Sequence, residues 1–62
     1  MELFLDNQKQ EIQFEGSISK LLSELKVMRE EVVVKVNRKL VPETVKIGKN
    51  DKVEVIKVVF GG

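Results

Sequence analysis

The chain has 62 residues, enough for one small domain, and a domain of this size buries only about 60% of the surface that its unfolded chain exposes. It contains no cysteine and no histidine, which excludes disulfides and thiol catalysis and removes the commonest general base and metal ligand. Hydrophobic residues make up 42% of the chain and charged residues 34%, which is typical of a globular domain rather than a disordered tail.

Nothing in the sequence predicts a targeting or membrane segment. The opening residues, MELFLDNQ, lack the basic and apolar regions of a signal peptide, and no run of bulky apolar residues exceeds three. We therefore expect a cytoplasmic protein without a membrane partner. The net charge is +1, with −3 in residues 1–31 (four basic, seven acidic) and +4 in residues 32–62 (seven basic, three acidic). Lysines that alternate with valines favour a solvent-exposed strand face over a nucleic-acid site.

The first half of the chain predicts a hairpin followed by a helix. Residues 2–6 and 11–15 alternate between apolar and polar side chains, as strands do, with a polar connection over residues 7–10. Gly16 is expected to end the second strand, and Ser17 is a favourable N-cap. A helix is predicted over residues 18–29, with an apolar stripe formed by Ile18, Leu21, Leu22 and Leu25.

The second half returns to strands. Residues 31–36 are rich in valine and predict a third strand, and residues 37–39 predict a turn. Residues 40–41 are expected to form a short edge strand that ends at Pro42, because proline cannot donate a ladder hydrogen bond. Residues 42–51 read as irregular, with turn chemistry at their end, and residues 52–60 predict the longest strand.

This order of elements predicts an α+β domain with a mixed sheet of four or five strands and one main helix packed on one face, the layout of the β-grasp fold. The first and last strands are expected to pair in parallel at the centre. We predict one domain over residues 1–60, followed by a flexible tail at residues 61–62. The predicted core contains Leu3, Leu5, Ile12, Phe14, Leu21, Leu22, Leu25, Val34, Val36, Val53 and Val55.

The most unusual chemical feature is the closing pair Gly61-Gly62. The segment IGKND lacks the spacing of a phosphate-binding loop, and the serines have no histidine to activate them. The α-carboxylate of Gly62 has an ordinary pKa of about 3.5, so it is an anion at neutral pH. Such a carboxylate can attack the α-phosphorus of ATP in a partner's active site. The last three residues reach about 10 Å when extended, and glycines pass through a narrow channel because they carry no Cβ.

At this point the sequence resembles the ubiquitin-like sulfur carrier family, which includes the sulfur carrier of thiamine biosynthesis and the small subunit of molybdopterin synthase. The similarity lies in the helix start EGSISKLLSEL, the turn from Asn37 to Pro42, and the segment from Asp51 through an apolar strand into Gly-Gly. Phe60 departs from the pattern, since these carriers often have a small residue there.

The resemblance implies that the chain is not an enzyme and binds no cofactor itself. An adenylyltransferase related to ubiquitin-activating enzymes would activate Gly62 with ATP and magnesium. A sulfur donor such as a cysteine desulfurase would then convert the terminus to a thiocarboxylate, which passes its sulfur to an acceptor enzyme in thiamine, molybdopterin or tRNA-thiolation pathways. Two alternatives stay open: a ubiquitin-like modifier joined through Gly62 to target lysines, and a small RNA- or protein-binding module that uses Arg38 and Lys39.

Strand alternation also predicts a docking face, because the core residues leave another set of side chains on the opposite side of the sheet. We expect this apolar patch to bind the activating enzyme, with Phe60 as an anchor and with Lys35 and Lys57 as its polar rim. The chain alone is expected to be monomeric. The predicted patch contains Phe4, Val33, Ile56 and Val58.

Overall fold

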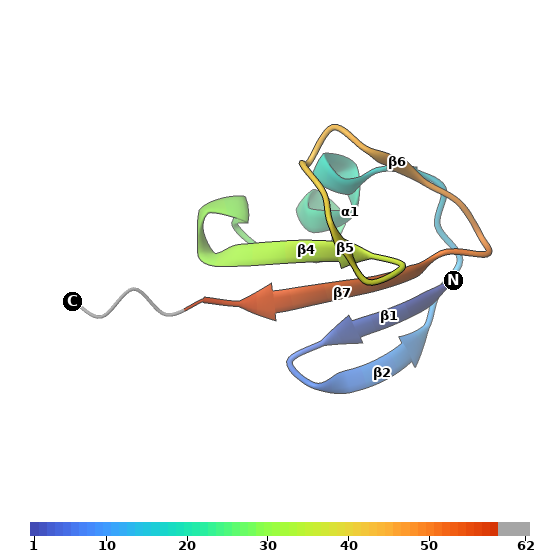
Figure 1. The fold of residues 1–62 in the computed structure, drawn as a ribbon, viewed down its shortest axis with the longest axis horizontal. Coiled ribbons are helices and arrows are strands. Elements are labelled where there is room, and N and C mark those ends of the chain that lie inside the picture. Colours follow the sequence, from blue (N-terminus) through green and yellow to red (C-terminus); the bar gives the residue numbers. More distant parts are fainter. Residues whose placement is uncertain (59–62) are drawn as a thin grey trace.

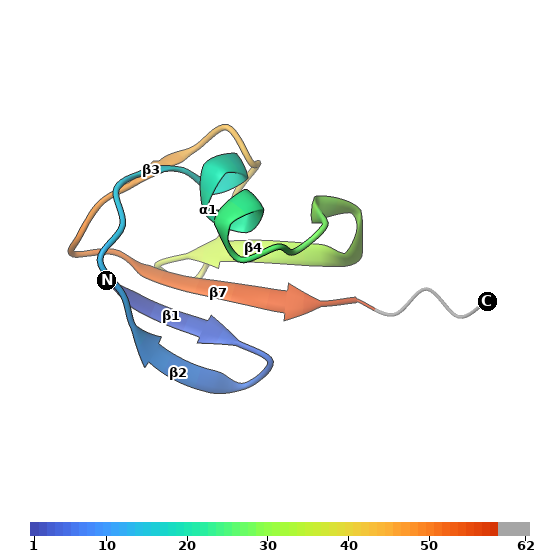
Figure 2. The same cartoon turned by 180° about the vertical axis from the view of Figure 1, so that it is seen from behind.

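The computed structural model describes residues 1–58, which form a five-stranded sheet in the order β2-β1-β7-β4-β5 (Figures 1 and 2). A second, two-stranded sheet joins β3 to β6. The elements in chain order are β1 (Glu2–Leu5), β2 (Gln8–Glu11), β3 (Gly16–Ser17), α1 (Ile18–Glu24), the 3-10 helix η1 (Arg29–Glu31), β4 (Val32–Val36), β5 (Lys39–Leu40), β6 (Lys46–Ile47) and β7 (Lys52–Lys57).

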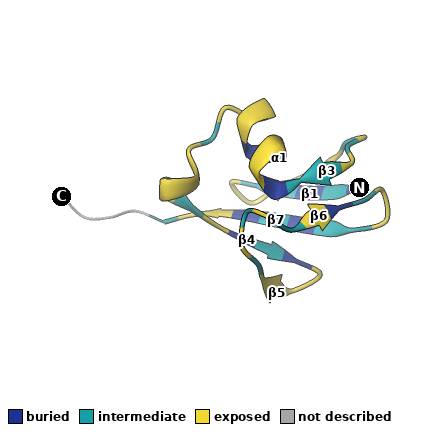
Figure 3. Ribbon diagram, turned by 90° about the horizontal axis from the view of Figure 1, so that it is seen from above, coloured by how far each residue is buried: buried dark blue, intermediate teal, exposed yellow. Residues whose placement is uncertain are grey.

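The centre of the large sheet is the parallel pair β1 and β7, with Leu3 opposite Val53 and Leu5 opposite Val55. β2 and β4 flank this pair and run antiparallel to it. Helix α1 packs across one face of the sheet, and the other face carries no helix among the described residues (Figure 3). The predicted β-grasp fold and its central parallel pairing are therefore confirmed.

The second strand lies earlier than the alternation in residues 11–15 predicted. β2 spans Gln8–Glu11, and residues 12–15 form no strand. The hairpin turn consists of Asp6 and Asn7, whose φ values are 52° and 63°. A two-residue turn with two left-handed residues matches the twist of paired strands, and Asp and Asn tolerate that conformation. The whole of β2 is exposed, so it has no apolar side chain that would mark it as a strand.

Helix α1 is shorter than the predicted 18–29. Its start is as expected, since the Ser17 hydroxyl accepts a hydrogen bond from the Lys20 amide at 3.2 Å. Its end is a Schellman motif: the Val27 amide donates to the Leu22 carbonyl at 2.9 Å, and the Lys26 amide donates to the Ser23 carbonyl at 3.1 Å. Lys26 has a φ of 59°, so a left-handed lysine stops the helix before its apolar stripe is complete.

Three further elements differ from expectation. The turn after β4 contains only Asn37 and Arg38, both left-handed, so β5 begins at Lys39 rather than at residue 40. Gly16 does not end a strand but begins β3, which pairs with β6 in a region expected to be irregular. β7 ends at Lys57, so Val58 is not in the strand as predicted, and the predicted residues 59–60 lie outside the described residues, as does the predicted domain end.

The core lies between α1 and the large sheet. Leu5, Ile12, Phe14 and Leu25, which were predicted as core, are only partly buried and pack against it. Met1, Ile18 and Ile47 belong to the core but were not among the predicted core residues, and Ile18 is fully buried. No helix in the described part of the chain is long and apolar enough to cross a membrane. The buried core consists of Met1, Leu3, Ile18, Leu21, Leu22, Val34, Val36, Ile47, Val53 and Val55.

Candidate docking face and its approach to the C-terminal residues

The sheet has an outer face, which we define as the face opposite α1. On β7, Val53 and Val55 are buried against the helix, so the intervening Glu54 and Ile56 point to the outer face. Strand register brings the predicted patch together there: Val33 lies opposite Ile56, and Phe4 lies opposite Glu54. The residues that alternation assigned to one surface are therefore on adjacent strands.

Large hydrophobic side chains are concentrated on this face. Val33 is 37% exposed and Ile56 is 38% exposed. Leu40 is 67% exposed and lies opposite Lys35, so it too belongs to the outer face. The sequence analysis missed Leu40, although a two-residue turn at Asn37 and Arg38 would have placed it in this register. Of the described residues with large exposed hydrophobic side chains, only Met28 lies elsewhere, in the segment before η1.

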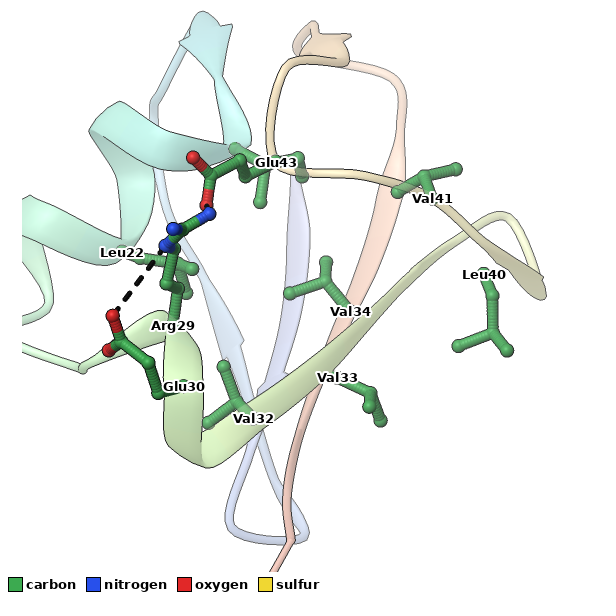
Figure 4. A pocket seen from close by; sticks show the side chains of 10 residues that line it. Leu22, Arg29, Glu30, Val32, Val33, Val34, Leu40, Val41 and Glu43 are labelled. Carbon is green, nitrogen blue, oxygen red and sulfur yellow. Dashed lines mark hydrogen bonds and ion pairs between the residues drawn. The ribbon is translucent and has the colours of Figure 1, made fainter.

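A groove continues this apolar surface around the first half of β4, beyond the part of that strand that pairs with β5 (Figure 4). Leu22, Val32 and Val34 line it on the helix side, and Val33 and Leu40 line it on the outer side. Its volume is about 350 Å³. The Arg29 guanidinium donates to the Glu43 carboxylate at 2.6 Å across the groove, and this contact raises the pKa of Arg29.

The other half of the outer face is charged. Lys9 and Glu2 form an ion pair of 2.8 Å, which lowers the pKa of Glu2 and raises that of Lys9. The Lys52 ammonium lies 5.1 Å from the centre of the Phe4 ring, a cation–π contact. The row of Phe4, Glu54, Lys35 and Leu40 therefore crosses the sheet between a charged half, near the start of β7, and an apolar half with Val33 and Ile56, near its end.

The two lysines predicted as the rim lie on different sides of the sheet. Lys35 pairs with Glu54 and is on the outer face. Lys57 pairs with Val32 and alternates with Ile56, so it starts from the helix-facing side. Its side chain is long enough to line a hollow of about 200 Å³ with Phe4 and Ile56. The prediction that both lie on one rim is therefore wrong for Lys57, because adjacent residues of a strand point to opposite faces and Ile56 is on the outer face.

The apolar half of the outer face leads to the end of the described chain. The Val58 amide donates to the Glu31 carbonyl at 2.8 Å, which extends the pairing of β7 with β4 by one contact. Val58 is partly buried. The remaining predicted site residues, Phe60, Gly61 and Gly62, lie outside the described residues. Within residues 1–58, no cluster of three carboxylate, histidine or cysteine side chains is placed to hold a metal ion.

A β-grasp domain with one open sheet face, followed by Gly61-Gly62, belongs to the class of small ubiquitin-like proteins. The model of the ThiS family matches residues 1–62, so the chain is a member of the ThiS family. Its fold is similar to the crystal structure of a thiamine biosynthesis protein, ThiS, from Geobacter metallireducens, with a TM-score of 0.68, 25% sequence identity and full coverage of both chains. No curated protein matches the chain. The resemblance to the sulfur carriers is thereby confirmed.

Proposed function

We propose that this chain is a sulfur carrier of thiamine biosynthesis that works through the carboxylate of Gly62. The observation that carries the proposal is the ThiS family match, which extends over the whole chain and includes Gly61 and Gly62. The similarity to the thiamine biosynthesis protein of Geobacter metallireducens, which covers all of both chains, supports the choice of pathway. The chain would be a carrier rather than an enzyme, and its partners would provide the catalytic groups.

The proposed chemistry has two steps. In the first, the Gly62 carboxylate attacks the α-phosphorus of ATP in an activating enzyme, pyrophosphate leaves, and an acyl adenylate forms. The ATP and magnesium belong to that enzyme, which would resemble the adenylating enzymes of ubiquitin-like proteins. In the second, the persulfide sulfur of a donor such as a cysteine desulfurase attacks the carbonyl carbon and AMP leaves, which gives an acyl disulfide, and a thiol reductant then cleaves its S–S bond to release the thiocarboxylate. The resulting thiocarboxylate would transfer its sulfur to an acceptor enzyme.

We further propose that the outer face docks on the activating enzyme. Its apolar half has Val33 and Ile56 on paired strands, near the point where the described chain ends at Val58, and Leu40 on β5 extends the apolar surface toward the middle of the sheet. An apolar patch of this kind, bordered by charged side chains, is typical of a protein interface. Phe60, which directly precedes Gly61, would add an anchoring side chain. Lys35 would lie at the edge of the patch, and Lys57 would approach it from the helix-facing side.

Extending the chain by one residue after Gly62 tests the activation step. The added residue moves the reacting carboxylate away from Gly62, so ATP–pyrophosphate exchange by the cognate activating enzyme should be abolished. The thermal midpoint should be unchanged, because no residue of the described core is altered. A control variant changes an exposed side chain of α1, Lys20→Gln, and should retain exchange. Wild-type exchange by the C-terminally extended chain would contradict the proposal.

The alternatives to this proposal predict different experimental results. A ubiquitin-like modifier would give a ladder of covalent adducts in an immunoblot of host extract, whereas a carrier gives a single small band. A passive binding module would keep its function after Gly61 and Gly62 are removed. A molybdopterin or tRNA-thiolation carrier would be activated in the same way but would restore a different pathway when the chain is returned to a deletion strain.

A further inference from the structure

Two turns are joined to each other where β7 begins. The side-chain amide of Asn37 donates to Asp51 at 3.0 Å, and its oxygen accepts from the Lys52 amide at 3.1 Å. The backbone amide of Asn37 donates to the Lys52 carbonyl at 2.8 Å. The second oxygen of Asp51 accepts from the Gly48 amide at 2.8 Å. The β4–β5 turn is thus held beside the turn before β7, at the end of the sheet away from Val58 (Figure 1).

This junction gathers positive charge. Arg38 and Lys39 follow Asn37, and Lys49 and Lys52 flank Asp51 in the other turn. Arg38, Lys39 and Lys49 are exposed, and Lys52 is partly buried. Within residues 1–58, the ion pairs involve only Met1, Lys9 and Arg29 as cations, so these four side chains have no carboxylate within 4.0 Å. Two acids lie near them: Asp51 has both oxygens engaged in hydrogen bonds, and Glu2, which lies opposite Lys52 on β1, pairs with Lys9.

We propose that Arg38, Lys39, Lys49 and Lys52, which we call the basic pole, bind a short acidic segment of a partner protein. Unpaired cations on a rigid junction offer a negative ligand a preorganised surface, and such charge complementarity accelerates association and orients the partner. The site does not depend on the chemistry of Gly62. Because the pole lies at the opposite end of the sheet from Val58, the exposed Arg38, Lys39 and Lys49 stay accessible when Val33 and Ile56 are covered.

The surroundings favour an acidic peptide over a nucleic acid. Single-stranded nucleic acid binds through aromatic stacking as well as charge. Two aromatic residues adjoin the pole, and neither offers a free ring: the Lys52 ammonium already lies over Phe4, and Phe14, which lines a hollow with Lys49, packs against the core. Glu11 and Glu15 line a hollow with Lys49, so a long phosphate backbone would meet negative charge on that side. A short acidic segment needs no free aromatic ring, and it is short enough to stay clear of Glu11 and Glu15.

The test is a titration of the full chain with a peptide of about four glutamates in low-salt buffer, monitored by amide chemical shifts. Shifts should concentrate at residues 37–39 and 48–52. The double variant R38Q/K49Q should bind about fivefold more weakly, and affinity should fall with added salt. The matched control K20Q/K26Q removes the same charge from exposed lysines elsewhere and should stay within about twofold of wild type.

Four results would overturn the proposal: no binding, shifts spread over all lysines, an equal loss in K20Q/K26Q, or an oligouridylate of equal charge that binds at least as tightly as the peptide. Arg38 and Lys49 make no side-chain hydrogen bond or ion pair in the described chain, so R38Q/K49Q should fold. Wild-type thermal midpoints for both double variants establish that a loss of binding is local.

Discussion

The two faces of the sheet use the same kinds of residue for different purposes. On β4, Val34 is 7% exposed and its neighbour Val33 is 37% exposed; on β7, Val55 is 3% exposed and Ile56 is 38% exposed. The difference comes from α1, which covers one face, while within residues 1–58 no helix covers the other. Hydrophobicity along a strand therefore predicts burial only together with what packs on each face. On the uncovered face, it predicts an interface.

Alanine substitution of two leucines, one on each face of the sheet, tests this difference most directly. Leu3 is 0% exposed in the core and Leu40 is 67% exposed on the outer face. Leu3→Ala should lower the free energy of unfolding by about 3 kcal/mol, because it removes buried methyl groups and leaves a cavity. Leu40→Ala should change it by less than about 0.5 kcal/mol. Urea denaturation of both variants gives the values, and similar losses would mean that Leu40 contributes to the core.

Ile56→Glu separates docking from folding. The variant places a charge in the apolar half of the outer face, so it should weaken binding to the activating enzyme by at least about 1–2 kcal/mol, in the range of an interface hot spot. The fold should remain, since Ile56 is not part of the core. Titration calorimetry measures the affinity, with Lys20→Glu on α1 as a surface control. The docking face lies elsewhere if Ile56→Glu and Phe4→Glu both bind with wild-type affinity.

The hydrogen bonds of Asp51 predict how stability depends on pH. The Gly48 amide, and next the Asn37 side chain, hold the pKa of Asp51 below its ordinary value. The folded state therefore binds this proton less readily than the unfolded state does. The stabilisation is present above the unfolded pKa and is lost as the pH falls through the folded pKa.

Stability should accordingly be nearly flat between about pH 6 and 8, because the chain has no histidine or cysteine, and should fall in acid. Asp51→Asn should flatten the acid limb, as measured by thermal midpoints across pH. A strong pH dependence of the thermal midpoint near neutrality would reveal another group with a shifted pKa. If Asp51→Asn loses as much stability in acid as the wild type does, other carboxylates cause that loss.

The smallest expected effect is an increase in stability. Lys26 closes α1 at a φ of 59°, where glycine carries no Cβ penalty. Lys26→Gly should raise the free energy of unfolding by about 0.5–1 kcal/mol and leave the outer face unchanged. Lys20→Gly, inside the same helix, is the opposite control and should destabilise by a similar amount. Urea denaturation measures both changes. A lower free energy of unfolding in Lys26→Gly would show that the lysine side chain stabilises the Schellman motif.

Much of the fold follows from the sequence because strand alternation is a local signal. It placed Leu3, Val34, Val53 and Val55 inside and Val33 and Ile56 outside, as the structure has them. The pattern carried no information about the β3–β6 pairing, which joins two-residue strands distant in the chain. It also missed β2, whose side chains are all polar and exposed, and the left-handed Lys26, which has no residue-type signature.

The candidate site likewise contains some residues that the sequence predicts and others that it does not. The outer patch was predictable from alternation, whereas Leu40 and the position of Lys57 depend on turn length and register. The junction that orients the basic pole depends on side-chain hydrogen bonds between Asn37 and Asp51, which are 14 residues apart. Contacts of that range follow from the folded chain and not from a local pattern.

The mass of the intact chain, purified from its own host, tests the central claim of this account. If the Gly62 carboxylate becomes a thiocarboxylate, one oxygen is replaced by sulfur, and part of the population should be heavier by about 16 Da. Fragmentation should place the added mass on Gly62, and a variant without Gly61 and Gly62 should lack it. If the heavier form is absent from cells that are making thiamine, or if the extra mass lies elsewhere in the chain, the claim that this protein carries sulfur on its terminal glycine is wrong.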